Sequence, residues 1–98
     1  MTTTALLELH VRADRLDDAA EVIDAVLRDT RAFDGCLGIE VLVDVADPAH
    51  VTVVERWRSL EHDDAYRAWR ATPEGGSGLG EIVDRPPVLT RCGTRSTL

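Results

Sequence analysis

Two residues of this chain have side chains suited to moving a proton on a small molecule. His10 is the best candidate general base, provided that its side chain faces a pocket, because an unperturbed imidazole titrates at about pH 6.5. Tyr66 carries a hydroxyl that can transfer a proton or hold a phenolate. We therefore predict His10 and Tyr66 as catalytic residues. The alternative for His10 is a strand histidine that is exposed or hydrogen-bonded at the rim of the sheet.

A second group of residues is suited to holding an aromatic ligand. Tyr66 and Trp69 are three positions apart, so on a helix they share a face, and with Trp57 they can stack against a flat ring. Glu55 falls in a central strand, where a buried carboxylate needs a cationic partner. We predict that the substrate-binding residues are Trp57, Trp69, Glu55, Arg67 and Arg91, with either arginine as the partner of Glu55. Core packing of the rings and a purely structural ion pair remain open.

The other reactive side chains predict no metal site and no cofactor. No two histidines have the i, i+4 spacing of helical metal ligands, and we expect His50 and His62 to be solvated. The glycine-rich run 75–80 neither follows a strand nor opens a long helix, so it does not predict dinucleotide binding. This run is either a pocket lid or a plain connection. We expect Cys36 and Cys92 to be free thiols.

The elements that position these residues follow from periodicity and turn signals. Alternating residues predict strands over 4–12, 36–46, 50–58 and 88–95. Apolar residues at i, i+3, i+4 spacing predict a helix that Asp14 caps and that ends before Asp34-Gly35. Ser59 caps a second predicted helix, which ends at Thr72-Pro73, and 81–84 adds a helical turn. Asp47-Pro48 is the predicted hairpin turn.

This order predicts an α+β, ferredoxin-like βαββαβ fold in one domain covering 1–98. Right-handed crossovers give a four-stranded antiparallel sheet of order 4-1-3-2 with both helices on one face. Strand two carries Leu37, Ile39, Val41, Val43 and Val45 on one parity and Leu42 on the other. Apolar residues on both faces predict that a second copy covers the sheet, forming a homodimer. A larger heteromeric partner is the alternative.

Composition excludes several classes of protein. The 98 residues carry a net charge of -7, which does not favour binding to nucleic acid or anionic lipid. No apolar run approaches the length of a membrane span, and the first ten residues lack the basic start of a signal peptide, so we expect a cytoplasmic protein with no membrane partner. The chain contains no Asn, Gln or Lys, so no side-chain amide is available to a catalytic scheme.

Several motifs together resemble the antibiotic biosynthesis monooxygenase family. They are Phe33-Asp34-Gly35-Cys36, Asp47-Pro48, Val54-Glu55-Arg56-Trp57-Arg58-Ser59, Trp69-Arg70-Ala71-Thr72-Pro73 and Pro86-Pro87. The resemblance implies a dimeric α+β barrel with a pocket between sheet and helices in each protomer. It also implies a choice of activities, since members include cofactor-free oxygenases of polyphenolic polyketides, haem-degrading enzymes and polyketide cyclases. The haem-degrading members carry a histidine about ten residues after the helix tryptophan, where this chain has Leu79.

The resulting functional hypothesis is a cofactor-independent monooxygenase of a small aromatic, polyketide-like or quinol substrate. The first alternative is a non-catalytic dimer that binds a small hydrophobic or aromatic ligand, which the lack of Asn favours, since the characterised oxygenases use a pocket Asn. A polyketide cyclase or isomerase of the same fold is the second alternative.

Overall fold

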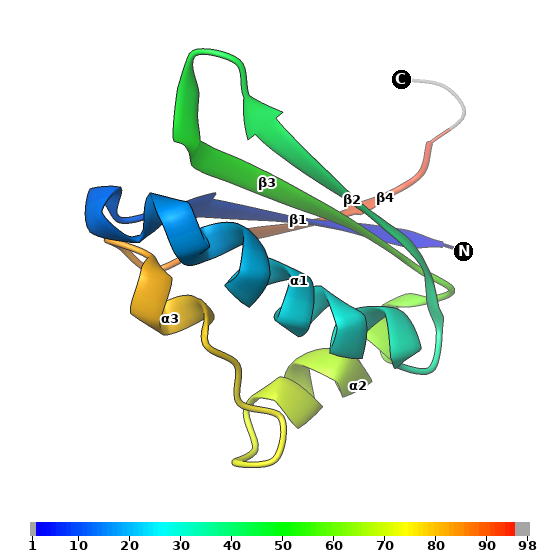
Figure 1. The fold of residues 1–98 in the computed structure, drawn as a ribbon. Helices are drawn as coiled ribbons and strands as arrows, with labels where there is room; N and C mark the ends of the chain where they lie inside the picture. The colour runs from blue at the N-terminus through cyan, green and yellow to red at the C-terminus, as the bar shows by residue number, and fades with distance from the viewer. Residues whose placement is uncertain (1, 96–98) are drawn as a thin grey trace.

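The computed structural model describes residues 2–95 and has the predicted element order (Figure 1). The strands are β1 (Thr3–His10), β2 (Cys36–Asp44), β3 (Asp47–Trp57) and β4 (Val88–Gly93). The helices are α1 (Leu16–Ala32), α2 (Leu60–Arg70) and the single turn α3 (Leu79–Ile82), and a 3-10 turn at Ala13–Arg15 precedes α1. The predicted α+β, ferredoxin-like fold is confirmed.

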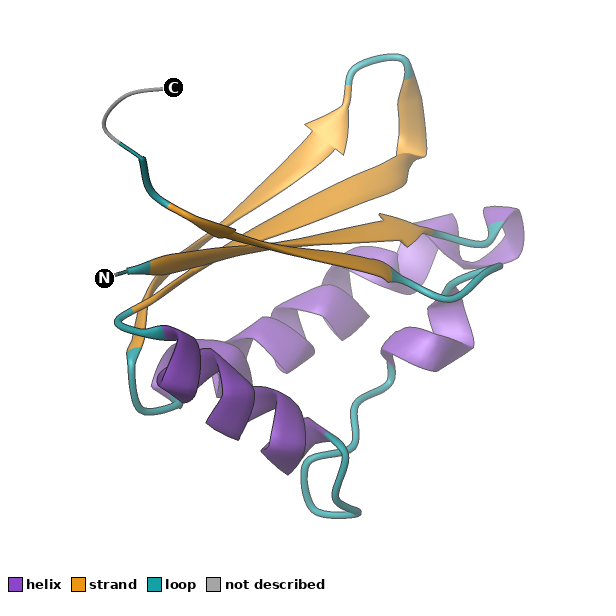
Figure 2. Cartoon of the chain, turned by 180° about the vertical axis from the view of Figure 1, so that it is seen from behind, coloured by secondary structure: helices purple, strands orange, loops and turns teal. Residues whose placement is uncertain are grey.

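The four strands form one antiparallel sheet in the order β2-β3-β1-β4, which is the predicted order read from the other edge. The helices lie on one face of this sheet and leave the other face open (Figure 2). Since β2 and β4 are opposite edges, Cys36 and Cys92 lie apart, and both are free thiols as predicted.

Strand alternation decides which side chains meet the helices. On β1 and β3 the odd-numbered positions face the helices, and they supply most of the buried core together with α1 and α3. The larger cluster consists of Leu9, Val11, Ala19, Ile23, Leu27, Val51, Val53 and Ile82. A smaller cluster under α2 consists of Ala5, Trp57 and Tyr66. The core therefore lies between the sheet and its helices, where the candidate site is also found.

The helical turn predicted over 81–84 is α3, which lies at Leu79–Ile82, and two other predicted boundaries are wrong for identifiable reasons. Asp14 does not cap α1, because the 3-10 turn moves the start of the helix to Leu16 and Asp14 forms an ion pair with Arg12 instead. Asp47-Pro48 is not the hairpin turn, because β3 already begins at Asp47. The turn consists of Val45 and Ala46 instead, and the Asp44 carboxylate accepts a hydrogen bond from the Ala46 backbone N–H at 2.8 Å.

The entry to α2 depends on a glycine and a cap. Ser59 caps the helix as predicted, since its Oγ accepts from the His62 backbone N–H at 3.2 Å. Gly35 has φ +90°, and a Cβ at that position would lie 2.3 Å from the His62 ring. The prediction that His62 is solvated is therefore wrong: its ring is half-buried against Gly35 and its Nδ1 lies 2.6 Å from Ser59 Oγ.

The open face of the sheet is mixed in character. By alternation it carries Leu6, Leu42, Val54 and Val88 among polar neighbours, so the prediction of apolar residues on both faces holds in part. Val41 and Val43 lie on the helix side but remain largely exposed at the β2 edge. Within residues 2–95, no helix has the length and hydrophobicity needed to cross a membrane.

Candidate functional site

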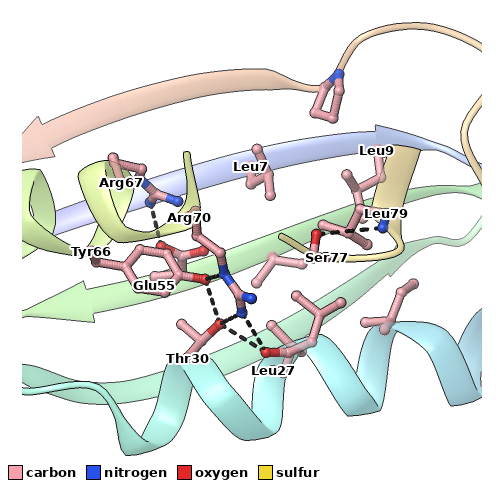
Figure 3. A pocket seen from close by; sticks show the side chains of 14 residues that line it. Leu7, Leu9, Leu27, Thr30, Glu55, Tyr66, Arg67, Arg70, Ser77 and Leu79 are labelled. Atoms are coloured by element: carbon pink, nitrogen blue, oxygen red, sulfur yellow. Dashed lines mark hydrogen bonds and ion pairs between the residues drawn. The ribbon is translucent and has the colours of Figure 1, made fainter. Parts of the chain in front are cut away.

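A pocket of about 220 Å³ lies between the sheet and the helices (Figure 3). Strands β1 and β3 form its floor, α1 forms one wall and α2 another, and the loop before α3 closes the end. Most of its surface is aliphatic and comes from Leu7, Leu9, Ile23, Val26, Leu27, Val53, Leu79 and Pro87. The polar residues are Thr30, Glu55, Tyr66, Arg67, Arg70 and Ser77. A concave apolar pocket with a few convergent polar groups is the usual form of a small-molecule site.

Glu55 is the acidic residue of this pocket, and 2% of its surface is exposed. One of its carboxylate oxygens, Oε1, accepts a hydrogen bond from Trp57 Nε1 at 3.1 Å. The same oxygen forms an ion pair with Nη2 of Arg67. A buried carboxylate is stable only with such partners, so the predicted need for a cation is met by Arg67.

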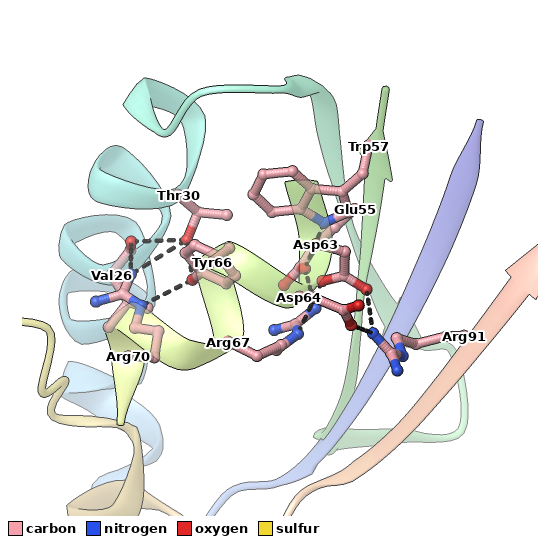
Figure 4. Close-up of polar contacts among 10 residues, drawn as sticks. All are labelled: Val26, Thr30, Glu55, Trp57, Asp63, Asp64, Tyr66, Arg67, Arg70 and Arg91. Carbon is pink, nitrogen blue, oxygen red and sulfur yellow. Dashed lines mark hydrogen bonds and ion pairs between the residues drawn. The ribbon is translucent and has the colours of Figure 1, made fainter. Parts of the chain in front are cut away.

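Arg67 lies between two buried carboxylates (Figure 4). Its Nε is 3.0 Å from Oδ1 of Asp63, which has no exposed surface, although the two atoms are not aligned as a hydrogen bond. Arg91 of β4 lies 3.4 Å from the other oxygen of Asp63 and also pairs with Asp64. Arg91 is therefore not the partner of Glu55 and does not line the pocket; it ties β4 to α2 instead.

Tyr66 and Arg70 form a network that joins α2 to α1. Arg70 Nε donates to the Tyr66 hydroxyl at 2.8 Å, and Nη2 donates to the Val26 carbonyl at 2.8 Å and to Thr30 Oγ1 at 3.2 Å. The Thr30 hydroxyl donates to the Val26 carbonyl at 3.1 Å, so the Tyr66 proton points to Thr30 across 2.6 Å. Arg70 also donates to the Gly75 carbonyl at 3.2 Å, which fixes the start of the glycine-rich loop.

The aromatic residues form a cluster in the core. Trp57, Tyr66, Phe33 and Trp69 have ring centroids 4.9–6.2 Å apart. Tyr66 is the member of this cluster that lines the pocket, whereas Trp57 is fully buried and Trp69 packs at the edge. Trp57 is therefore placed in the core and Trp69 at its edge, and Trp57 contacts the pocket residue Glu55 through its hydrogen bond.

His10 lies on the opposite face of the sheet from this pocket. It pairs with His50 across the β1–β3 ladder, and the two rings stack with centroids 4.8 Å apart and an interplanar angle of 7°. The condition for its predicted role as base is not met, because the pocket is lined by Leu7 and Leu9, of the other parity. His10 is thus separated from Tyr66, Glu55 and Arg67 by the sheet itself.

His50 keeps about a quarter of its side chain exposed (27%), and both of its ring nitrogens also have carboxylate partners, which the sequence did not predict. Its Nδ1 lies 2.9 Å from Asp44 and its Nε2 lies 3.0 Å from Glu8. The bond to Asp44, and then the bond to Glu8, raise the pKa of His50 above its ordinary value, because both carboxylates favour the imidazolium.

Sequence reasoning missed two residues of the site, Arg70 and Thr30. Arg70 is four positions after Tyr66 on a helix, so the i, i+4 spacing was an available signal. Thr30 gave no such signal, since only the packing of α1 against α2 brings it to Tyr66. Among the described residues, no three His, Cys, Asp or Glu side chains are grouped so that they could hold a metal ion.

Comparisons with known proteins agree with this architecture. The model of the antibiotic biosynthesis monooxygenase family matches residues 2–75. Rv0793 of Mycobacterium tuberculosis superimposes with a TM-score of 0.80 at 22% sequence identity, over 98% of this chain and 97% of that one. A conserved protein of Methanosarcina mazei Go1 superimposes with a TM-score of 0.83 at 15% sequence identity, over 97% of this chain and 94% of that one. A crystal structure described as an antibiotic biosynthesis monooxygenase superimposes with a TM-score of 0.79 at 16% sequence identity, over 95% of this chain and 98% of that one.

At such low identities these structures establish the common fold, and the search of curated proteins gave no significant match. The match of the family model covers three quarters of the sequence, including the Glu55 and Trp57 strand and the helix with Tyr66 and Arg67. The chain belongs to the antibiotic biosynthesis monooxygenase family.

Proposed function

We propose that this chain is a cofactor-independent monooxygenase of a small aromatic substrate with an ionisable hydroxyl, of the polyketide-like or quinol type. The observation that carries the proposal is the pocket, which combines aliphatic walls with one polar end. A flat ring loses water contact between Leu7, Leu9 and Leu27, while its oxygen reaches Glu55 and Arg67. The pocket therefore offers an apolar surface to the ring and polar partners to the hydroxyl.

The proposed reaction needs a substrate anion and dioxygen. The anion passes an electron to O₂, and the two radicals combine into a carbon-bound peroxide anion, which takes back the proton removed from the substrate and becomes a hydroperoxide. Loss of water then leaves a carbonyl, so that the CH₂ group of an anthrone and O₂ become C=O and H₂O. A quinol reacts at a ring C–H instead and gives a hydroxyquinone and H₂O. The substrate loses four electrons and O₂ gains four, so no further reductant is needed. The aliphatic walls support this chemistry because they keep water from the reactive intermediates.

The predicted site residues take different parts in this proposal. Glu55, Arg67 and Tyr66 line the pocket and contact the substrate, and Trp57 holds Glu55. The Tyr66 hydroxyl already serves Thr30 and Arg70, so we assign Tyr66 to the wall and not to proton transfer.

Oxygen uptake with an anthrone or a dihydroquinone tests the proposal. We expect uptake that needs the native protein, with one O₂ consumed for each quinone formed and ¹⁸O from ¹⁸O₂ in the product of the anthrone. Ser77→Trp should slow it, because Ser77 is an exposed loop residue at the pocket end and an indole there fills the cavity. Glu74→Trp is the matched control, since Glu74 is exposed nearby and does not line the pocket. Uptake no faster than with heat-denatured protein contradicts the proposal.

The non-catalytic binding protein stays as the second candidate, because of one observation. Many of the polar groups in the pocket already bond to one another, and the chain has no side-chain amide that could join them. Binding of the same substrates without oxygen uptake supports this candidate. A rearranged product without oxygen consumption indicates a cyclase or isomerase instead.

The open sheet face supports assembly as a homodimer. Leu42 and Val88 are each 51% exposed there, and a second sheet packed face to face removes them and the half-buried Leu6 from water. Light scattering during size exclusion tests this assembly. A mass of one chain at micromolar concentration argues against it.

A further inference from the structure

The polar end of the pocket contains one unused acceptor and one unused donor. Both partners of the Glu55 carboxylate, Trp57 Nε1 and Arg67 Nη2, bind the same oxygen, Oε1. The other oxygen, Oε2, has no hydrogen-bond partner among residues 2–95, and the same is true of Arg67 Nη1. Neither atom is one of the fully buried side-chain atoms that lack a partner, and both residues line the pocket.

We infer that Glu55 Oε2 and Arg67 Nη1 together recognise a phenol or quinol hydroxyl, and that Glu55 takes its proton. This inference rests on the proposed function and adds the group that generates the substrate anion. A hydroxyl donates one hydrogen bond and accepts others, which matches one free acceptor beside one free donor. A ketone or ether offers only acceptors and leaves Oε2 unpaired, which is unfavourable at a buried carboxylate.

The proton step balances within the pocket. The substrate O–H bond breaks, a new O–H bond forms on Glu55 Oε2, and the electron pair stays on the substrate oxygen. The Nη1–H of Arg67 donates to that oxygen, and the bond is stronger to a phenolate than to a phenol because it is charge-assisted. The pair of negative and positive charges is kept, since the charge moves from the carboxylate to the neighbouring phenolate. No electron leaves the substrate until O₂ arrives.

The groups around Glu55 leave it as the proton acceptor. From α2 it faces Arg67, Asp63 and Tyr66; Asp63 is held by Arg67 and Arg91, and the Tyr66 proton is directed to Thr30. From β2 the thiol of Cys36 lies close enough for the Glu55 charge to contribute to raising its pKa, after the larger effect of desolvation. From α1 the pocket receives Thr30 and aliphatic side chains.

The histidines do not compete with Glu55. His10 and His50 are on the far face of the sheet, and His62 contacts Gly35 and Ser59 outside the pocket lining. Among the residues that line the pocket there is therefore no histidine that could take the proton.

Binding of 4-nitrophenol tests the inference without any oxygenation, because the phenol and phenolate absorb at different wavelengths. Below the pKa of the free probe, the wild-type protein should bind it with the phenolate spectrum. The dissociation constant should not change with pH in that range, since the proton moves to Glu55 and none is released. A phenol spectrum in the wild type, no binding, or an affinity that rises about tenfold per pH unit each overturns the inference.

Glu55→Gln gives the decisive comparison. The variant keeps an oxygen for Trp57 and Arg67 but replaces Oε2 with an amide NH₂ group, which donates hydrogen bonds and cannot take a proton. We expect affinity to fall by about ten- to a hundredfold, the range for a hydrogen bond to a charged group. Any remaining bound probe should show either the phenol spectrum or a phenolate whose affinity rises about tenfold per pH unit. A folded variant that keeps both the phenolate spectrum and the flat pH profile overturns the inference.

Two further variants separate the site from general effects. Arg67→Gln removes Nη1 and should lower the phenolate fraction, whereas Arg12→Gln removes an exposed guanidinium paired with Asp14 and should change nothing. Glu21→Gln on the exposed surface of α1 is the matched control for Glu55→Gln. If Glu55→Gln does not fold by circular dichroism, Arg67→Gln and the wild-type pH profile decide the question.

The two proposals fail in distinguishable ways. If the probe behaves as expected but no quinol or anthrone consumes oxygen, the oxygenase proposal fails and the hydroxyl site stands. If oxygen uptake is normal in a folded Glu55→Gln variant, the oxygenase stands and Glu55 is not its base.

Discussion

The Tyr66→Phe substitution is the sharpest test of the network that joins the two long helices. Phenylalanine keeps the ring between Phe33 and Trp57, so most apolar burial is retained, while the hydroxyl is lost from a residue that is 3% exposed. That hydroxyl bonds Thr30 at 2.6 Å and accepts from the Arg70 guanidinium at 2.8 Å.

The expected loss follows from these two bonds. The neutral bond is worth about 1 kcal/mol and the bond from a charged donor about 1.5–3 kcal/mol. Arg70 keeps the Val26 and Gly75 carbonyls as acceptors, which reduces the second amount. We therefore expect Tyr66→Phe to lower the free energy of unfolding by about 2–3 kcal/mol.

Urea unfolding followed by far-UV circular dichroism measures this loss, at one fixed protein concentration so that association does not contribute. A double-mutant cycle with Thr30→Val should give a coupling of at least about 0.5 kcal/mol, because both residues serve one hydrogen bond. Thr2→Val, at an exposed position before β1, is the control and should have little effect. A loss below about 0.5 kcal/mol for Tyr66→Phe, or strict additivity with Thr30→Val, refutes the network.

Three further substitutions probe other contacts. His50 has a raised pKa, so its hydrogen bonds to carboxylates stabilise the fold fully below about pH 6.5, and this stabilisation is lost as the pH rises through the folded-state pKa. His50→Gln should remove this part of the pH dependence of the free energy of unfolding. Gly35→Ala should cost about 1–3 kcal/mol, since it combines positive φ with a clash against His62, and His62→Ala should restore only the part due to the clash. Asp63→Asn should lower the free energy of unfolding, measured by chemical denaturation, by about 2–4 kcal/mol, because it weakens the pairing of a fully buried carboxylate. An unchanged denaturation midpoint shows that the ion pairs of Asp63 with Arg67 and Arg91 do not stabilise the fold.

The topology could be predicted because it depends on patterns that are local in sequence. Alternation in the strands, helical spacing and the Ser59 cap are each visible within a short window, and together they fix the order of elements. The prediction failed at Asp14 and at Asp47, where a 3-10 turn and an aspartate turn at Asp44 moved the boundaries by a few residues.

The site could be predicted only in part, because it depends on which side of the sheet each parity faces. His10 was assigned on the chemistry of its side chain, but the register with His50 and the position of the helices place it on the open face. Glu55 had two candidate partners in the sequence, and only the packing of α2 over β3 selects Arg67 while β4 directs Arg91 to Asp63 and Asp64.

A crystal structure of the chain with a small phenol bound shows whether Glu55 and Arg67 hold the hydroxyl of the ligand. We expect electron density for the ring against Leu7 and Leu9, with the phenol oxygen within hydrogen-bond distance of Glu55 Oε2 and Arg67 Nη1. A ring bound beside His10 and His50 on the open face of the sheet, or one in the pocket with its oxygen turned away from Glu55, contradicts this expectation.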